Sequence, residues 1–140
     1  MDESINQNHD NSDDIAMKKA AEIAIDYATD FGVNLDYSST TVEPLENILD
    51  EYSNSIKIEQ PSEIDIWRLS ALFGAYLGEV MLRNGLSEDG YRWGNDDMGM
   101  YPVLIGNNDF IIAPIDKVFK RLVNGAEDSV ISFFDAVFVR

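Results

Sequence analysis

The sequence contains no cysteine and a single histidine, His9, among its 140 residues. Without cysteine the chain has no disulfides and no thiolate nucleophile. Transition-metal sites usually take histidine or cysteine ligands, and His9 lies in a polar segment near the N-terminus. We therefore expect no such metal site in the folded domain, and no cofactor is indicated.

Long apolar runs are also missing. None reaches the roughly 18 residues that a membrane-spanning helix needs. The N-terminal stretch MDESINQNHDNSDD lacks the basic region and apolar core of a secretory signal. We expect a cytoplasmic protein that does not enter a membrane. Phosphate-binding loops, G-x-S-x-G nucleophile motifs and calcium-loop spacings are absent, which makes an enzyme the least favoured class.

Positive charge is scarce. Ten lysines and arginines face 26 acidic residues, for a net charge of −16. Residues 1–66 hold 16 acids and 3 bases, whereas residues 67–140 hold 10 acids and 7 bases. This surface repels phosphate backbones, so we expect no direct nucleic-acid binding, and it attracts a basic partner protein. The alternative is that the charge serves only solubility.

The remaining pattern predicts a single α+β domain, with about five helices packed on a small antiparallel sheet of about three strands. Residues 1–12 are predicted to form a disordered acidic tail, and residues 13–140 the domain. Apolar periodicity and end signals predict helices at 13–31, after a capping box of Thr40 and Glu43, and at 63–84, 115–124 and 127–138. Strands are predicted at 91–93, 100–105 and 109–114, with a turn at 106–108.

The first predicted helix has an apolar face that is rich in alanine. The residues on this face are Ala16, Met17, Ala20, Ile23, Ala24, Tyr27, Ala28 and Phe31. Such a face permits close approach to a neighbouring helix.

The third predicted helix carries the stretch LFGAYLGEVMLRNG and is apolar nearly all round, which indicates a central, buried helix. Gly74 and Gly78 each cost about 1 kcal/mol relative to alanine in a helix, so we expect another backbone, such as the alanine-rich first helix, to approach closely there. Glu79 precedes Arg83 by four residues on the only polar seam, which predicts a half-exposed ion pair. The functional alternative is a carboxylate in a groove, held by Arg83 and available to a partner.

Two other features combine charge with aromatic or basic neighbours. Arg92 and Trp93 form the residue pair that protein interfaces favour, although Trp93 can equally cover the sheet as a core residue. Lys117, Lys120 and Arg121 cluster on the predicted wet face of the 115–124 helix. This cluster is either a solvated face or a contact to an acidic surface, such as the N-terminal half of another copy in a homo-oligomer.

Several segments occur together over residues 33–134: LDYSSTTVEPLENILDEY, LFGAYLGEVMLRNG, YRW and KVFKRLVNGAEDSVISFF. In this order they resemble an uncharacterised family of small bacterial proteins with a GAYLGEV-type helix. The resemblance implies a compact α+β domain without an established activity, and it implies that Glu79 and the turn from Lys120 to Asp128 share one site. The residues that carry the resemblance are Tyr37, Gly74, Tyr76, Gly78, Glu79, Trp93, Lys120, Arg121, Gly125, Glu127 and Asp128.

Three functional hypotheses stay open. The first is a non-enzymatic protein-interaction module of immunity or antitoxin type, whose acidic N-terminal half covers a basic surface. The second is a small-ligand or regulatory domain with a pocket near Glu79, Arg83, Arg92 and Trp93, and the third is an enzyme. The candidate binding residues are Glu79, Arg83, Arg92, Trp93, Lys120, Arg121 and Asp128.

Overall fold

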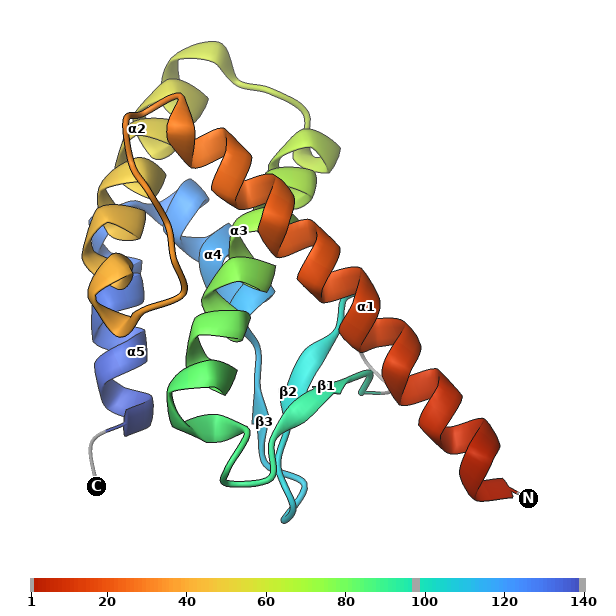
Figure 1. The fold of residues 1–140 in the computed structure, drawn as a ribbon. Helices are drawn as coiled ribbons and strands as arrows, with labels where there is room; N and C mark the ends of the chain where they lie inside the picture. Colours follow the sequence, from red (N-terminus) through yellow and green to blue (C-terminus); the bar gives the residue numbers. More distant parts are fainter. Residues whose placement is uncertain (1, 97–98, 139–140) are drawn as a thin grey trace.

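The computed structural model describes residues 2–96 and 99–138, with side chains described from residue 12 onward. The described residues form five α-helices on a small antiparallel sheet, which confirms the predicted α+β domain (Figure 1). The helices are α1 (Asp2–Thr29), α2 (Val42–Glu59), α3 (Glu63–Met81), α4 (Pro114–Asn124) and α5 (Val130–Phe138). The strands are β1 (Arg92–Gly94), β2 (Val103–Ile105) and β3 (Ile111–Ile112).

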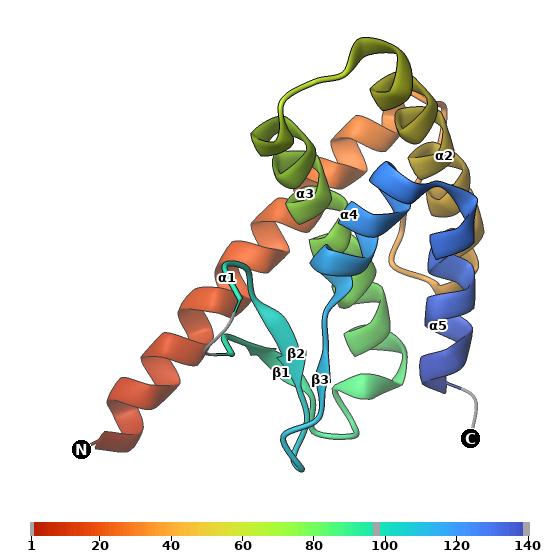
Figure 2. The same ribbon diagram turned by 180° about the vertical axis from the view of Figure 1, so that it is seen from behind.

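Helix α3 is the centre of the fold, as its apolar sequence predicts. Helix α1 crosses one side of α3, and α4 packs on the opposite side (Figures 1 and 2). Phe73, Tyr76, Leu77 and Val80 are fully buried between these layers. A π-turn, η2 (Leu82–Leu86), then leads from α3 toward the sheet.

Helix α1 buries part of the face that was predicted for it. Met17, Ala21, Ala24 and Ala28 are buried at helical spacing, whereas Ala16, Ile23 and Tyr27 of the predicted face are exposed. Three of the four buried residues belong to the predicted face, and the buried stripe is rotated from its centre toward Ala21. Alanine lacks a side chain beyond Cβ, so the alanine stripe lets α1 lie close against α3.

The helix also begins at Asp2, before the predicted start at Asp13. The tail prediction for residues 1–12 stays a prediction, because the side chains of residues 1–11, including His9, lie outside the described part.

The three strands pair in the order β1-β2-β3, with Trp93 opposite Leu104 and Leu104 opposite Ile112. Trp93 and Leu104 are buried, so this face of the sheet belongs to the core. Pro102 directly precedes β2, where no ladder donor is needed. The predicted turn after Ile105 is present, with Asp109 in the left-handed region at φ 63°. The predicted strands are therefore confirmed in place, with β1 shifted by one residue and β2 and β3 shorter than predicted.

The helix ends show which local signals are correct. The Ser62 side chain accepts a hydrogen bond from the Asp65 N–H, which confirms the predicted start of α3. The capping box of Thr40 and Glu43 is wrong, because a 3₁₀ turn, η1 (Ser39–Thr41), comes first and Thr41 is the N-cap of α2 without a side-chain cap. The predicted last helix is divided into a 3₁₀ turn, η3 (Ala126–Asp128), and α5. In the described part of the chain, no helix is both long and apolar enough to cross a membrane.

Candidate functional site

Glu79 is buried, which corrects the prediction of a half-exposed residue on a wet seam. Only 1% of its surface is accessible. The predicted pair with Arg83 exists, with Arg83 Nη2 3.2 Å from Glu79 Oε1. The second carboxylate oxygen accepts a hydrogen bond of 2.8 Å from the indole N–H of Trp93. The spacing of four residues predicted the pair of Glu79 with Arg83 correctly, but it gave no sign that Trp93 of β1 covers the Glu79 carboxylate.

The glycines of α3 make room for two neighbours other than α1. A β-carbon on Gly74 would lie 2.4 Å from the Cα of Ile115, and one on Gly78 would lie 2.3 Å from the Trp93 ring. The prediction of close packing is therefore confirmed, while the predicted neighbour is wrong. The Trp93 ring fills the space over Gly78, so this side chain belongs to the core. Arg92, the residue before it, is exposed.

Tyr37 lies beside Arg83, the partner of Glu79, and has an unusual backbone conformation. Its φ of 70° is uncommon for a residue other than glycine. Three contacts hold it: the Tyr37 N–H donates to the Tyr76 hydroxyl at 2.9 Å, the rings of the two tyrosines stack, and Asn84 Nδ2 donates to the Tyr37 carbonyl. The Arg83 guanidinium lies 3.6 Å from the centre of the Tyr37 ring. Burial raises the pKa of the Tyr37 hydroxyl above its ordinary value.

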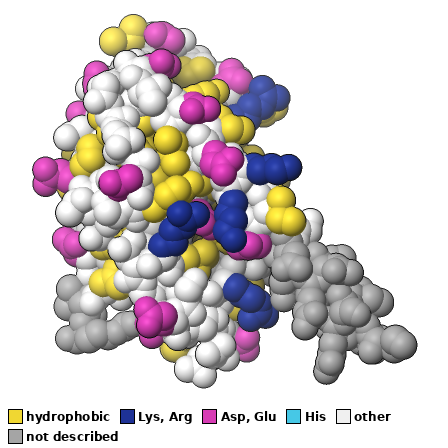
Figure 3. Space-filling view, in the orientation of Figure 1, with side chains coloured by type: hydrophobic (Ala, Val, Ile, Leu, Met, Phe, Trp, Pro, Cys, Tyr) yellow, Lys and Arg dark blue, Asp and Glu magenta, His cyan; other side chains and the backbone are white. Residues whose placement is uncertain are grey.

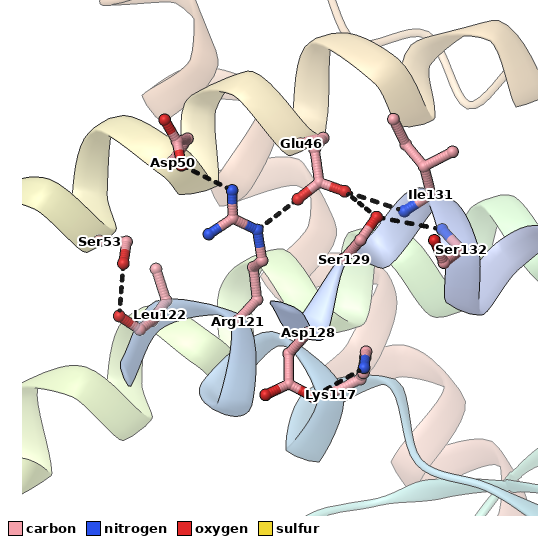
Figure 4. A network of polar contacts seen from close by, with 10 residues as sticks. All are labelled: Glu46, Asp50, Ser53, Lys117, Arg121, Leu122, Asp128, Ser129, Ile131 and Ser132. Carbon is pink, nitrogen blue, oxygen red and sulfur yellow. Dashed lines mark hydrogen bonds and ion pairs between the residues drawn. The ribbon is translucent and has the colours of Figure 1, made fainter. Parts of the chain in front are cut away.

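Arg121 is the second buried charge, and its position corrects the predicted wet face. Its side chain is 2% accessible and reaches from α4 to two carboxylates of α2 (Figure 4). Arg121 Nε donates to Glu46, and Nη2 donates to Asp50 at 2.8 Å. Nearby, the Ser53 hydroxyl donates to the Leu122 carbonyl at 2.9 Å. These bonds fix α4 against α2.

Glu46 joins the same network to α5. Its Oε1 accepts hydrogen bonds from the Ser129 hydroxyl at 2.7 Å and from the Ile131 N–H at 3.0 Å. Burial raises the pKa of Glu46, but the bonds from Ser129, Arg121 and the Ile131 N–H outweigh this effect, so the pKa lies below its ordinary value. The Glu46 carboxylate thus holds the start of α5 and the last turn of α4 against α2.

The rest of the predicted basic cluster forms exposed or half-buried pairs. Lys117 lies 3.1 Å from Asp128, and Lys120 lies 3.2 Å from Asp116. Glu79 therefore belongs to one network, on α3 and β1, and Arg121 to another, on α2, α4 and α5. The implied single site of Glu79 and the Lys120–Asp128 turn is not formed by these contacts.

Comparison of the chain with protein-family models, curated proteins and solved structures finds no match.

Grooves flank α2 on several sides and share one chemical character. One of about 460 Å³ lies between the start of α2 and α5, and another of about 220 Å³ lies between the end of α2 and the start of α3. A third lies beside Phe31 and Tyr52. Each has apolar or aromatic lining and at least one carboxylate, and none is lined by lysine or arginine.

The distribution of surface charge agrees with this character. In Figure 3, lysine and arginine side chains gather over α1 and α3. Helix α2 carries four exposed acids and one exposed lysine, Lys57, in its last turn. The exposed acids of α2 are Glu43, Asp50, Glu51 and Glu59. Within residues 12–96 and 99–138, no three histidine, cysteine or acidic side chains are placed to hold a metal ion.

Sequence reasoning missed Glu46, Asp50 and Ser129, and it named Tyr37 only through the resemblance. Glu46 and Asp50 are four residues apart, so they lie together on one face of α2. The signal that could have identified them was Arg121, whose position between the buried Val118 and Leu122 requires a carboxylate partner.

Proposed function

We propose that this chain is a non-enzymatic protein-interaction module that binds a basic partner protein through α2 and its flanking grooves. The observation that carries the proposal is the chemistry of those grooves, each of which combines an apolar lining with carboxylates and without basic side chains. Apolar anchors beside complementary charge are the features that protein interfaces use for affinity and orientation. An immunity or antitoxin role, in which the acidic side covers a basic toxin, fits this arrangement.

The predicted small-ligand pocket near Glu79 receives less support. Both carboxylate oxygens of Glu79 already have protein partners, and the Trp93 ring is buried against Gly78. A ligand there would need to displace core contacts. The small-ligand hypothesis stays a prediction that a thermal-shift screen with metabolites tests.

A capture experiment in extract of the source cells tests the interaction proposal. The variant Glu43→Gln/Glu51→Gln/Glu59→Gln removes three exposed charges from α2, and Glu22→Gln/Asp26→Asn/Asp30→Asn removes three exposed charges from α1 and the turn that follows it. We expect basic proteins to be retained at low salt by the parent chain and by the α1 variant, and to be lost with the α2 variant. Retention of the same proteins by both variants would contradict the role of α2.

A further inference from the structure

Helix α5 is strongly apolar, yet most of its side chains are incompletely covered. Its sequence is VISFFDAVF, and only Val130 is fully buried. Ile131, Phe133, Phe134, Val137 and Phe138 are half-buried. Helix α4 shows the contrast, since its apolar stripe of Ile115, Val118 and Leu122 is completely covered. Part of the apolar surface of α5 is therefore available for contact with another molecule.

The groove of about 460 Å³ lies along this incompletely covered helix. Val42, Ile131 and Phe134 provide its apolar lining, with Ser39 and Thr40 at one end. Glu43 of α2 and Asp135 of α5 also line it, and both are exposed. Among the described residues, neither carboxylate has an ion-pair partner. The groove thus offers an apolar floor between two available negative charges.

The walls of this groove are fixed before any partner arrives. Ile131 lines the groove through its side chain, and its N–H donates to Glu46 of α2. Ser129, which accepts a hydrogen bond from the Ser132 N–H at the start of α5, also donates to Glu46. Because α2 and α5 are joined through buried polar contacts, little ordering is needed when a ligand binds.

On the basis of the proposed function, we infer that the α2–α5 groove binds one amphipathic, basic helix of the partner protein. Aliphatic or aromatic side chains of that helix pack on Ile131 and Phe134, and its lysines or arginines pair with Glu43 and Asp135. A groove between two helices accommodates a helical ligand, which is recognised through the apolar side chains on one of its faces.

A second copy of this chain is the disfavoured occupant for reasons of charge. Each copy has a net charge of −16, so two acidic surfaces repel one another. At least six of the ten lysines and arginines already pair with carboxylates of their own chain. A partner of opposite charge satisfies Glu43 and Asp135 without breaking those pairs.

The test uses a synthetic helix of leucines and lysines with a leucine stripe at helical spacing. The control peptide has the same composition in scrambled order, so that its charge is kept and its stripe is lost. Backbone amide shifts of the ¹⁵N-labelled full chain locate the binding site at low salt. We expect the shifts to cluster at Ser39, Thr40, Val42, Ile131 and Asp135, with the scrambled peptide binding about tenfold more weakly.

Two double variants distinguish this groove from the rest of α2. We expect Glu43→Gln/Asp135→Asn to weaken peptide binding by about tenfold. Glu51→Gln/Glu59→Gln removes the same amount of charge from α2, outside this groove, and should leave the affinity within about twofold. Neither pair takes part in the buried network, and thermal melts of both variants verify that the fold is kept.

Each other outcome overturns the inference. Equal binding of the scrambled peptide means attraction by charge alone, and shifts confined to the α2–α3 groove place the partner elsewhere on α2. Concentration-dependent shifts at the groove without peptide identify a second copy as the occupant. In these cases α2-dependent capture from extract can persist, so the proposed function survives. If neither the peptide nor any basic protein binds through α2, both proposals fail.

Discussion

Glycine is required at position 74 because a neighbouring backbone occupies the space of a β-carbon. The contact is with the Cα of Ile115 at the start of α4, which cannot rotate away as a flexible side chain would. Interior glycine normally weakens a helix, and here that cost is offset by the packing of α4 directly on α3.

We therefore expect Gly74→Ala to lower the free energy of unfolding by about 1–3 kcal/mol, as overpacking does, in spite of the better helix propensity of alanine. Urea denaturation measures the change. Ala71→Gly at a half-buried position of the same helix is the control, with an expected loss of about 1 kcal/mol, chiefly from helix propensity. An increase in stability for Gly74→Ala would show that α4 has room to move.

The burial of Glu79 changes the effect on stability that is expected of the substitution Glu79→Gln. On an exposed seam, Glu79→Gln would barely change stability. In the structure, Glu79 accepts bonds from both Trp93 and Arg83. The amide keeps an acceptor for the indole but loses the charge that Arg83 faces.

We expect Glu79→Gln to cost about 1–3 kcal/mol, within the range for hydrogen bonds to charged groups. The thermal midpoint and urea denaturation measure it. Glu88→Gln, an exposed carboxylate in the loop after α3, is the matched control and should change stability by less than about 0.5 kcal/mol. Equal effects of the two substitutions would mean that the buried contacts of Glu79 add nothing.

Among the elements, those with a clear period were predictable and those defined by tertiary contacts were not. The apolar spacing of Val42, Leu45, Ile48 and Leu49 predicts the buried face of α2 correctly. The predicted face of α1 contains Met17, Ala24 and Ala28, which are buried, but its Ile23 and Tyr27 are exposed because the stripe that meets α3 consists mainly of alanines. The wet face assigned to Arg121 failed for a related reason, since its carboxylate partners lie more than 70 residues earlier in the chain.

The α2–α5 groove could not be predicted from the sequence. Its two sides, around Val42 and Phe134, are brought together only by the packing of α2 against α5. The acidic character of the N-terminal half was evident, but which of its carboxylates are buried depends on Arg121 and Ser129. Composition thus predicts the sign of the partner's charge, whereas the place of contact requires the fold.

The network around Glu46 makes the packing of α2 with α4 and α5 sensitive to acid. In the folded protein, the pKa of the Glu46 carboxyl lies below its ordinary value of 4.5. Because the pKa of Glu46 is lower in the folded than in the unfolded chain, its charge stabilises the fold fully at any pH above the pKa of the unfolded chain. This stabilisation is lost as the pH falls through the pKa of the folded chain. Glu46→Gln removes this charge at every pH.

We expect the parent chain to exceed Glu46→Gln in stability by about 1–3 kcal/mol at pH 7, and this advantage to shrink as the pH falls below about 4.5. Urea denaturation of both proteins across this range gives the difference directly, so that titration common to both cancels. Glu51→Gln, an exposed change on the same helix, should show no such convergence. A difference that stays constant with pH would contradict the role assigned to the Glu46 carboxylate.

Across the whole molecule, the net charge of −16 produces long-range repulsion that destabilises the folded state. The Debye length falls from about 30 Å at 0.01 M ionic strength to about 8 Å at 0.15 M, so salt screens repulsion across the molecule. Salt also weakens the exposed ion pairs, such as Lys18 with Asp14 and Lys120 with Asp116, but each contributes little. Repulsion involves many more charges and should dominate.

We therefore expect the stability to rise by about 1 kcal/mol between these ionic strengths, which corresponds to a few degrees in the thermal midpoint. The variant Glu22→Gln/Asp26→Asn/Glu51→Gln/Glu59→Gln removes four exposed charges without touching either buried network. It should be more stable than the parent at low salt and should gain less from added salt. The comparison of slopes isolates repulsion from general effects of salt on apolar burial, which both proteins share. Parallel slopes would show that the excess negative charge does not destabilise the fold, and that its retention needs no compensating role in binding.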